Sequence, residues 1–306
     1  MIMKAINNMG RRCLLSFALL FTMATWLNAQ KIQQAKKVLR LDSLYYAAAT
    51  ASNPQAEIAR LVREDPANAD WLAYRVLDPN AQEEHAAEVL LRMYRHPQLL
   101  RLYADTETAY SRGVADSIAR SIIAAFDRLQ QLEPTMAVPQ YVGFHVSGLQ
   151  QSVVALPDLV SVAIDKYIRP DYPIYVQFFS DYERQTMSPE YVVRDALLGW
   201  ICSERPLPRE TVLTLRFQLE YWGDIFRLMR AVFPDATEEW LFGFTSEQLQ
   251  WLRQNKKILL SNAQKRGEME SSQPSVTDRY FRELPPDQLL PPEAPRLIGY
   301  WLGANL

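Results

Sequence analysis

The chain has 306 residues, of which 22% are charged and 48% are hydrophobic, and its formal net charge at pH 7 is −2. This near balance of charge excludes the strongly basic surface that nucleic-acid binding requires, so we expect no nucleic-acid partner. The length allows one large domain or two small ones, and the low count of 10 glycines favours one compact domain.

The first 29 residues have the features of a secretory signal peptide. Lys4, Arg11 and Arg12 precede the apolar stretch CLLSFALLFTMA, and the sequence LNA, which ends at Ala29, is a plausible cleavage site. The apolar stretch has about a dozen residues, fewer than the roughly 20 that cross a bilayer as a helix. We therefore expect an exported protein that lies in the periplasm or is associated with the outer envelope.

The two cysteines are expected to form neither a lipid anchor nor an internal disulfide. In a lipoprotein the modified cysteine follows the apolar stretch, whereas Cys13 precedes it. We expect the mature chain to begin near Gln30 without a lipid, which leaves Cys202 as its only cysteine. The surrounding sequence GWICSE indicates a buried thiol on a helix.

Helical periodicity dominates the chain after the signal peptide. The segment KVLRLDSLYYAAATA is predicted to begin as a short strand and to become helical at its alanines. A helix is predicted from Asp116 to Leu132, where Pro134 ends it. This helix and a later one are expected to bury six core side chains, namely Ile118, Ile122, Phe126, Leu129, Val193 and Leu197.

Residues 141–168, YVGFHVSGLQQSVVALPDLVSVAIDKYI, are the most strand-like part of the sequence. Turn residues at Ser147–Gly148 and Pro157–Asp158 divide the stretch. Strands are therefore predicted near residues 141–147, 151–155 and 159–165.

The first of these strands shows an alternating pattern. Val142, Phe144 and Val146 alternate with Gly143 and His145, which is typical of a half-buried strand. Strands enclosed by helical segments indicate an α+β fold. We predict a mostly helical domain with a small antiparallel sheet.

Three later segments carry the local features that begin or end helices. In MSPEYVVRDALLGWICSE, Ser188 is expected as the N-cap and Pro189 at the first helical position. The amphipathic segment RETVLTLRFQLEYWGDIFRLMRAVF is expected to form a long helix that Pro234 ends. Thr245 and Gln248 have the spacing of a capping box. The proline-rich tail LPPDQLLPPEAPRLIGYW is predicted to be extended, and its terminal aromatic residues are expected to anchor it.

The sequence shows no pattern typical of a metal, cofactor or catalytic site. No pair of the three histidines, His85, His96 and His145, has the ligand spacing of a motif such as His-Glu-x-x-His. A Gly-rich phosphate loop and a Gly-x-Ser-x-Gly elbow are also absent from the sequence. We therefore predict no metal, no cofactor and no catalytic residue. A hydrolase with two carboxylates stays open, because such pairs meet only in the folded chain.

The densest polar and aromatic cluster lies in IDKYIRPDYPIYVQFFSDY. It contains four candidate binding residues, Asp165, Tyr167, Tyr172 and Tyr175. Tyrosines interleaved with acids suit a groove for a peptide or a glycan, since their rings are amphipathic. The alternative is an ordered loop whose tyrosines cover the core.

Four segments in order resemble the gliding-motility lipoprotein B (GldB) family of Bacteroidetes. They are RLDSLYY, FHVSGLQQSVVALPDLVSVAIDKYIRPDYPIY, GFTSEQLQWLRQN and PPEAPRLIGYWLG. The similarity extends from about Val38 to Trp301, so we expect residues 30–306 to form a single GldB-like domain. The resemblance implies partners among the envelope proteins of a motility or secretion machinery, and it leaves open a peripheral association with the membrane.

The family is itself similar to zincin-type metallopeptidases, which carry zinc ligands on helices beside a cleft. Here the first such helix, EYVVRDALLGW, has no histidine, and Trp222, Gly223 and Asp224 stand where the family usually has Glu-Gly-Lys. The resemblance therefore implies a degenerate zincin-like cleft, to which Asp195 and Trp222 are added as candidate binding residues. We expect a non-catalytic protein that acts through protein contacts.

The alternative function is a residual hydrolase that acts on a peptide or glycan through carboxylates in the same cleft. If Asp165, Asp195 or Glu220 converged around one pocket with raised carboxyl pKa values, an enzyme would be favoured. A cleft that tyrosine and leucine line without convergent acids would favour binding.

Overall fold

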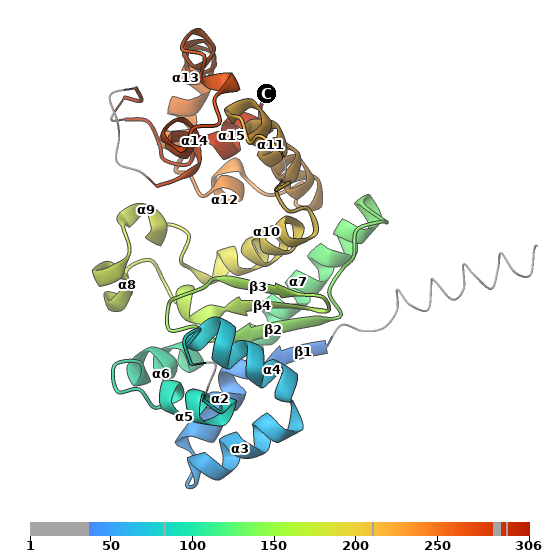
Figure 1. The fold of residues 1–306 in the computed structure, drawn as a ribbon, viewed down its shortest axis with the longest axis vertical. Helices are drawn as coiled ribbons and strands as arrows, with labels where there is room; N and C mark the ends of the chain where they lie inside the picture. The colour runs from blue at the N-terminus through green and yellow to red at the C-terminus, as the bar shows by residue number, and fades with distance from the viewer. Residues whose placement is uncertain (1–36, 82–83, 210, 284–288, 292) are drawn as a thin grey trace, which may run out of the picture. The chain divides into compact units, whose positions relative to one another are not determined.

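Four short strands form one sheet, and the burial of each strand matches its place in that sheet. The computed structural model describes residues 37–81, 84–209, 211–283, 289–291 and 293–306. The sheet order is β1-β2-β4-β3 (Figure 1), where the strands are β1 (Lys37–Arg40), β2 (Tyr141–His145), β3 (Val153–Leu156) and β4 (Leu159–Ala163). β4 is buried along its whole length and lies between two strands, whereas β3 is partly exposed at an edge.

The sheet is mixed, so the prediction of an antiparallel sheet is wrong, although the three predicted strands match to within two residues at each end. β4 pairs in parallel with β2, with Val142 opposite Val160, and it pairs antiparallel with β3. Residues 146–152 carry the chain past the position of β4 to the edge, and the turn at Pro157–Asp158 returns it to the centre. β4, apolar except for the buried Ser161, takes this central place because both of its faces can then be buried.

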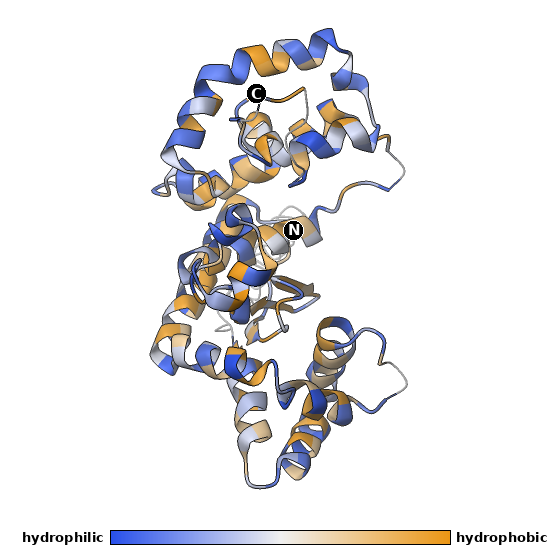
Figure 2. Ribbon diagram, turned by 90° about the vertical axis from the view of Figure 1, so that its left-hand side faces the viewer, coloured by the Kyte–Doolittle hydropathy of each residue, from blue (hydrophilic) through white to orange (hydrophobic). Residues whose placement is uncertain are grey.

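Helices form most of the described chain, and Figure 2 shows hydrophobic and hydrophilic residues on the same helices. The elements between β1 and β2 are α2 (Leu41–Thr50), α3 (Pro54–Glu64), α4 (Pro66–Trp71), the π-helical turn η1 (Leu72–Leu77), α5 (Ala86–Tyr94), α6 (Leu100–Ala109) and α7 (Arg112–Leu132). The elements after β4 are the 3₁₀ turn η2 (Ile164–Lys166), α8 (Pro173–Phe178), α9 (Asp181–Arg184), the 3₁₀ turn η3 (Pro189–Tyr191), α10 (Val192–Glu204), α11 (Leu215–Val232), α12 (Glu238–Phe242), α13 (Ser246–Lys265), the 3₁₀ turn η4 (Glu268–Glu270), α14 (Pro274–Phe281) and α15 (Ile298–Ala304).

Both faces of β2 are buried, which corrects the prediction of a half-buried first strand. Val142 and Phe144 belong to a core that α7, α10 and α11 complete. On the other face, His145 is fully buried and its ring lies edge-on against Trp71, with 5.3 Å between the ring centroids. The positions that were expected to face solvent are covered because the helices before β2 pack there.

The predicted helical core is largely confirmed. Ile122, Phe126, Leu129 and Leu197 are buried, whereas Ile118 and Val193 are only partly buried at the border of the same core. The helix predicted from Asp116 begins four residues earlier, at Arg112, and ends at Leu132 as expected.

The helix caps give a mixed result. Thr245 and Gln248 form the predicted capping box at the start of α13. Ser188 stands at the N-cap and Pro189 at the first helical position, as predicted, but the turn that they begin is 3₁₀ and the Ser188 side chain makes no cap hydrogen bond. The long helix begins only at Leu215, where the Thr214 side chain accepts a hydrogen bond from the backbone N–H of Phe217.

The described residues 289–291 and 293–297 of the predicted tail form no helix or strand, but its last four residues begin the helix α15, which corrects the prediction there. α15 packs along α11, and the two helices approach each other where Gly223 faces Gly303. The predicted anchoring by aromatic residues is confirmed, because Trp301 is buried and the ring of Tyr300 contacts that of Trp222.

Residues from Val38 to Leu306 form one compact unit. The predicted signal peptide, with Cys13 and the expected start of the mature chain at Gln30, lies outside the described residues. Among the described helices, none combines the length and the hydropathy of a membrane span.

Candidate functional site

Asp165, the first predicted binding residue, holds a turn inside the protein. It is fully buried, and its carboxylate accepts hydrogen bonds of 2.9 Å from the backbone N–H groups of Ser147 and Leu149. Burial raises the pKa of Asp165 to about 6, although these two hydrogen bonds lower it. The bonds stabilise an unusual backbone, since Gly148 and Leu149 both have positive φ angles.

The paired glutamines fix the other side of this turn. The Gln150 side chain donates to the backbone carbonyl of Leu77 at 3.1 Å, and the Gln151 side chain donates to that of Arg75 at 2.9 Å. Both carbonyls belong to the π-helical turn η1. The two glutamines between β2 and β3 therefore join the turn to η1.

Tyr172 and Tyr175 cover the core between the first helices and the sheet. Both are buried, and burial raises the pKa of each hydroxyl. The Tyr172 hydroxyl donates to Asp105 at 2.8 Å, and the Tyr175 hydroxyl donates to the backbone carbonyl of Asp165. This is the arrangement that the alternative interpretation of the cluster describes, tyrosines that cover the core.

Tyr167 and Asp195, two of the candidate binding residues, lie together. The Tyr167 hydroxyl donates to one carboxylate oxygen of Asp195 at 2.8 Å, and the Arg194 guanidinium binds the other at 2.7 Å. Both residues line a pocket of about 230 Å³, which we call the Lys166 pocket. Its lining comprises Ser152, Lys166, Tyr167, Phe179, Tyr182, Glu183, Thr186, Met187, Arg194, Asp195, Phe242, Gly243, Glu283 and Leu297.

Trp222 lies elsewhere, on the part of α11 that α15 covers. Its ring meets that of Tyr300 edge-on, with 4.8 Å between the centroids, and it also contacts Tyr221. The side chain is partly buried against the core. Trp222 does not belong to the lining of the Lys166 pocket.

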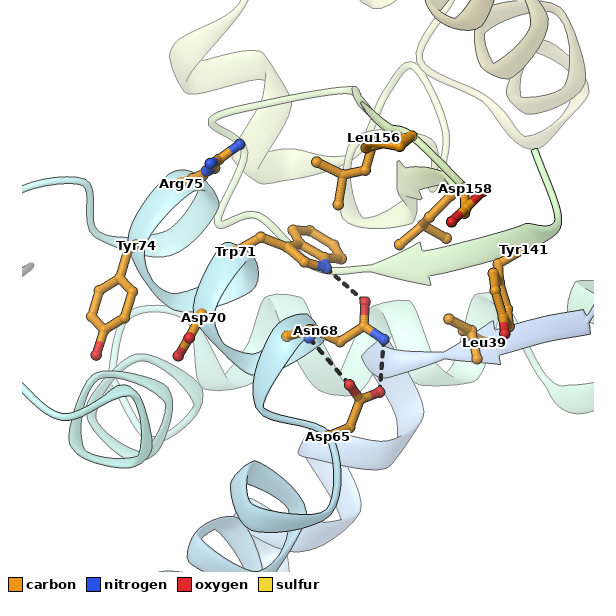
Figure 3. A pocket seen from close by; sticks show the side chains of 13 residues that line it. Leu39, Asp65, Asn68, Asp70, Trp71, Tyr74, Arg75, Tyr141, Leu156 and Asp158 are labelled. Atoms are coloured by element: carbon orange, nitrogen blue, oxygen red, sulfur yellow. Dashed lines mark hydrogen bonds between the residues drawn. The ribbon is translucent and has the colours of Figure 1, made fainter. Parts of the chain in front are cut away.

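A larger hollow, which the sequence analysis missed, lies between α4, η1 and the sheet (Figure 3). This α4–sheet groove has a volume of about 940 Å³. Its lining comprises Leu39, Asp65, Ala67, Asn68, Asp70, Trp71, Tyr74, Arg75, Tyr141, Leu156, Pro157, Asp158 and Leu159. The lining comes from four separate stretches of the sequence, namely Leu39, residues 65–75, Tyr141 and residues 156–159, so no local motif predicts the groove.

A chain of hydrogen bonds fixes the α4 wall of the groove. Asp65 caps α4 and also accepts a bond from the Asn68 side chain at 2.7 Å, and the Trp71 indole donates to Asn68 at 2.7 Å (Figure 3). The next residues form η1, and π-helical turns occur frequently at functional sites. The groove is therefore preformed on one side.

The groove combines an apolar floor with an acidic rim. Leu39, Tyr141 and Leu156 provide half-buried apolar surface. Asp70 and Asp158 are exposed on the rim, Asp65 is half-buried, and Arg75 is the single basic residue among the described lining residues. Acidic groups over an apolar floor can hold a chain that carries both apolar and basic side chains.

The acids named for a hydrolase do not converge. Asp195 lines the Lys166 pocket, Asp165 belongs to neither hollow, and Glu220 is exposed on α11. Asp165 has the raised carboxyl pKa, but it is bound to a backbone turn. The three acids named from the sequence therefore give no support to the hydrolase.

The histidines and the thiol do not assemble a reactive centre either. His145 shares a 2.8 Å hydrogen bond with Ser161, and burial lowers its pKa to about 3. Cys202 lies half-buried on α10, and burial raises its pKa to about 11, which leaves it a thiol. In the part of the chain that the structure describes, no three His, Cys, Asp or Glu side chains are grouped to hold a metal.

Comparison with known proteins gives one result. No curated protein and no solved structure matches the chain. A family model described as "Gliding motility protein GldB" matches residues 25–306, nearly the whole chain. The chain therefore belongs to the GldB family of gliding motility proteins.

Proposed function

We propose that this GldB-family protein is a non-catalytic component of a motility or secretion apparatus in the periplasm or outer envelope. In this proposal it binds an extended, positively charged segment of a partner protein in the α4–sheet groove. The observation that carries the proposal is the composition of the groove lining, which has three aspartates and one arginine around an apolar floor.

The size and charge of the groove support this class of partner. A volume of about 940 Å³ is at the upper end of the roughly 300–1,000 Å³ found for ligand pockets, so several side chains of a partner fit. The exposed carboxylates of Asp70 and Asp158 attract basic side chains and speed their encounter. Leu39 and Leu156 add apolar contacts.

We prefer the groove to a degenerate metallopeptidase-like cleft as the contact surface. In such a cleft Trp222 would line an opening, but here α15 packs beside it and Tyr300 contacts its ring. Export through the signal peptide, the start near Gln30 and the absence of a lipid on Cys13 stay predictions. Sequencing the N-terminus of the protein purified from the envelope tests them.

Photo-crosslinking in the native envelope tests the proposal. A crosslinking amino acid at Ala67, an exposed position of the groove, is compared with one at Ile258, which is exposed on α13 and outside the groove. We expect Ala67 alone to capture a basic segment of one envelope protein. The substitutions Asp70→Asn and Asp158→Asn should weaken that capture, because both carboxylates are exposed on the rim.

Two results would contradict the proposal. One is the same set of products from Ala67 and Ile258, since that would show encounters without a specific site. The other is a yield at Ala67 that does not change when both aspartates are neutralised, since the acidic rim would then have no part in binding.

A further inference from the structure

The Lys166 pocket contains a cation that lacks an ion pair. Lys166 ends η2 and is partly buried, with its ammonium 5.2 Å from the centre of the Phe179 ring. Burial lowers the pKa of Lys166. The charges of Asp165, Glu183 and Asp195 act on this ammonium, but among the described residues no carboxylate lies within the 4.0 Å of a salt bridge to it. A partly desolvated charge that no close ion pair compensates is costly, so a site of this kind favours an anionic group.

Two carboxylates converge on another part of the same pocket. Ser180 joins them, because its backbone N–H donates to Glu183 at 2.8 Å and its hydroxyl donates to Glu283 at 3.4 Å. Burial and the neighbouring charge of Glu183 raise the pKa of Glu283. The charge of Arg296 acts on Glu283, but neither carboxylate forms a salt bridge with a residue that the structure describes. Two like charges held this close favour a cationic group between them.

The remaining charged wall is already paired. Asp195 uses one oxygen for Arg194 and the other for Tyr167, and Arg194 also donates to the backbone carbonyl of Trp240. The charge of Asp195 still acts on Lys166, but no salt bridge joins them. Lys166, Glu183 and Glu283 are therefore the charged groups of the described lining that form no salt bridge.

We propose that the Lys166 pocket binds a small zwitterion of the size of a free amino acid. The ligand carboxylate contacts Lys166, and the ligand ammonium contacts Glu183 and Glu283. The volume of about 230 Å³ is below the roughly 300 Å³ at which pockets for drug-sized ligands begin, so the ligand is small. This site is separate from the α4–sheet groove, and the inference does not rest on the proposed function.

The same charges disfavour simpler occupants. A divalent cation would be attracted to the glutamates but repelled by Lys166. Phosphate would be attracted to Lys166 but repelled by the glutamates. A zwitterion satisfies both sets of charges at once, and loss of either of its charged ends leaves one set unpaired.

Calorimetric titration of the full mature protein with each common L-amino acid, one at a time, tests the inference. Calcium and inorganic phosphate serve as competing probes. We expect at least one amino acid to bind, and we expect its N-acetyl and amide forms to bind about tenfold more weakly or worse, since each lacks one charged hydrogen bond. Lys166→Gln and Glu283→Gln should each weaken binding by about the same factor. Lys257→Gln, at an exposed position on α13, should leave it unchanged.

The inference is overturned if no amino acid binds, or if calcium or phosphate binds more tightly than any amino acid. Unchanged affinity in Lys166→Gln and Glu283→Gln would also overturn it, because binding would then occur elsewhere. Glu283 is partly exposed near the surface, so Glu283→Gln still gives a result if Lys166→Gln does not fold.

Discussion

Replacement of Gly223 by alanine should destabilise the protein although alanine favours helices. Gly223 lies in α11, where the backbone of Gly303 in α15 approaches it. A Cβ atom at position 223 would come within 2.7 Å of the Gly303 carbonyl carbon. The obstructing atoms belong to a backbone, so no side-chain rotation removes the clash, and α15 must move away from α11.

The size of the effect follows from two opposed contributions. Overpacking typically costs about 1–3 kcal/mol, and a clash with a rigid backbone belongs at the upper end. Alanine recovers about 1 kcal/mol of helix propensity. We therefore expect a net loss of about 2 kcal/mol, which lowers the melting temperature by about 4–8 °C in a domain of this size.

Thermal and urea unfolding of Gly223→Ala and of a matched variant, Gly113→Ala, measure the effect. Gly113 is also helical, in α7, but nothing lies within 4 Å of the Cβ that alanine would add. Gly113→Ala should therefore be neutral or stabilise the protein by up to about 1 kcal/mol. If Gly223→Ala were as stable as Gly113→Ala, the close approach of α11 and α15 would be refuted.

Three further predictions concern metal, pH and capping. The purified protein should contain less than about a tenth of an equivalent of zinc, because the predicted ligand positions lack the roughly three ligands of a zinc site. Chelators should for the same reason leave its melting temperature unchanged. Zinc that is bound stoichiometrically and whose removal by a chelator lowers the melting temperature would instead support the hydrolase. His145, whose folded-state pKa is lowered to about 3, should contribute stability that is present above its unfolded pKa of 6.5 and is lost as the pH falls towards 3. His145→Gln should therefore flatten the loss of melting temperature between these pH values, and an unchanged slope would show that His145 titrates freely. Thr245→Ala should cost about 1 kcal/mol of unfolding free energy in urea, since its hydroxyl accepts the N–H of Gln248 at 3.2 Å; no loss would mean that solvent replaces the cap.

Features set by neighbouring residues were predictable from the sequence. The Thr245 capping box and the end of α7 before Pro134 depend on residues within one turn of each other. Ser188 has the same local pattern as a cap, but the chain enters a 3₁₀ turn there and its hydroxyl makes no cap bond. A local pattern therefore fails where packing selects another backbone conformation.

The order of the strands and the location of the groove could not be predicted in this way. Placing β4 between β2 and β3 requires knowledge that helices cover both faces of the sheet. The α4–sheet groove joins residues 65–75 with residues 141 and 156–159. The tyrosine cluster was visible in the sequence, but the direction of each side chain depends on distant partners, such as Asp105 for Tyr172.

The two hollows lie at opposite ends of β4, and this arrangement allows a test of whether they communicate. Leu159, the first residue of the strand, lines the groove, and Lys166, which follows the strand in η2, lines the other pocket. β4 is buried throughout and pairs with a strand on each side, so a shift of the strand would break both ladders at once. Coupling between two sites needs an element that can adopt two arrangements, whereas β4 has a single arrangement. We therefore expect the crosslinking yield at Ala67 to be independent of any amino acid bound beside Lys166. A yield that rises or falls with the amino acid would show that β4 is not the rigid link that its burial implies.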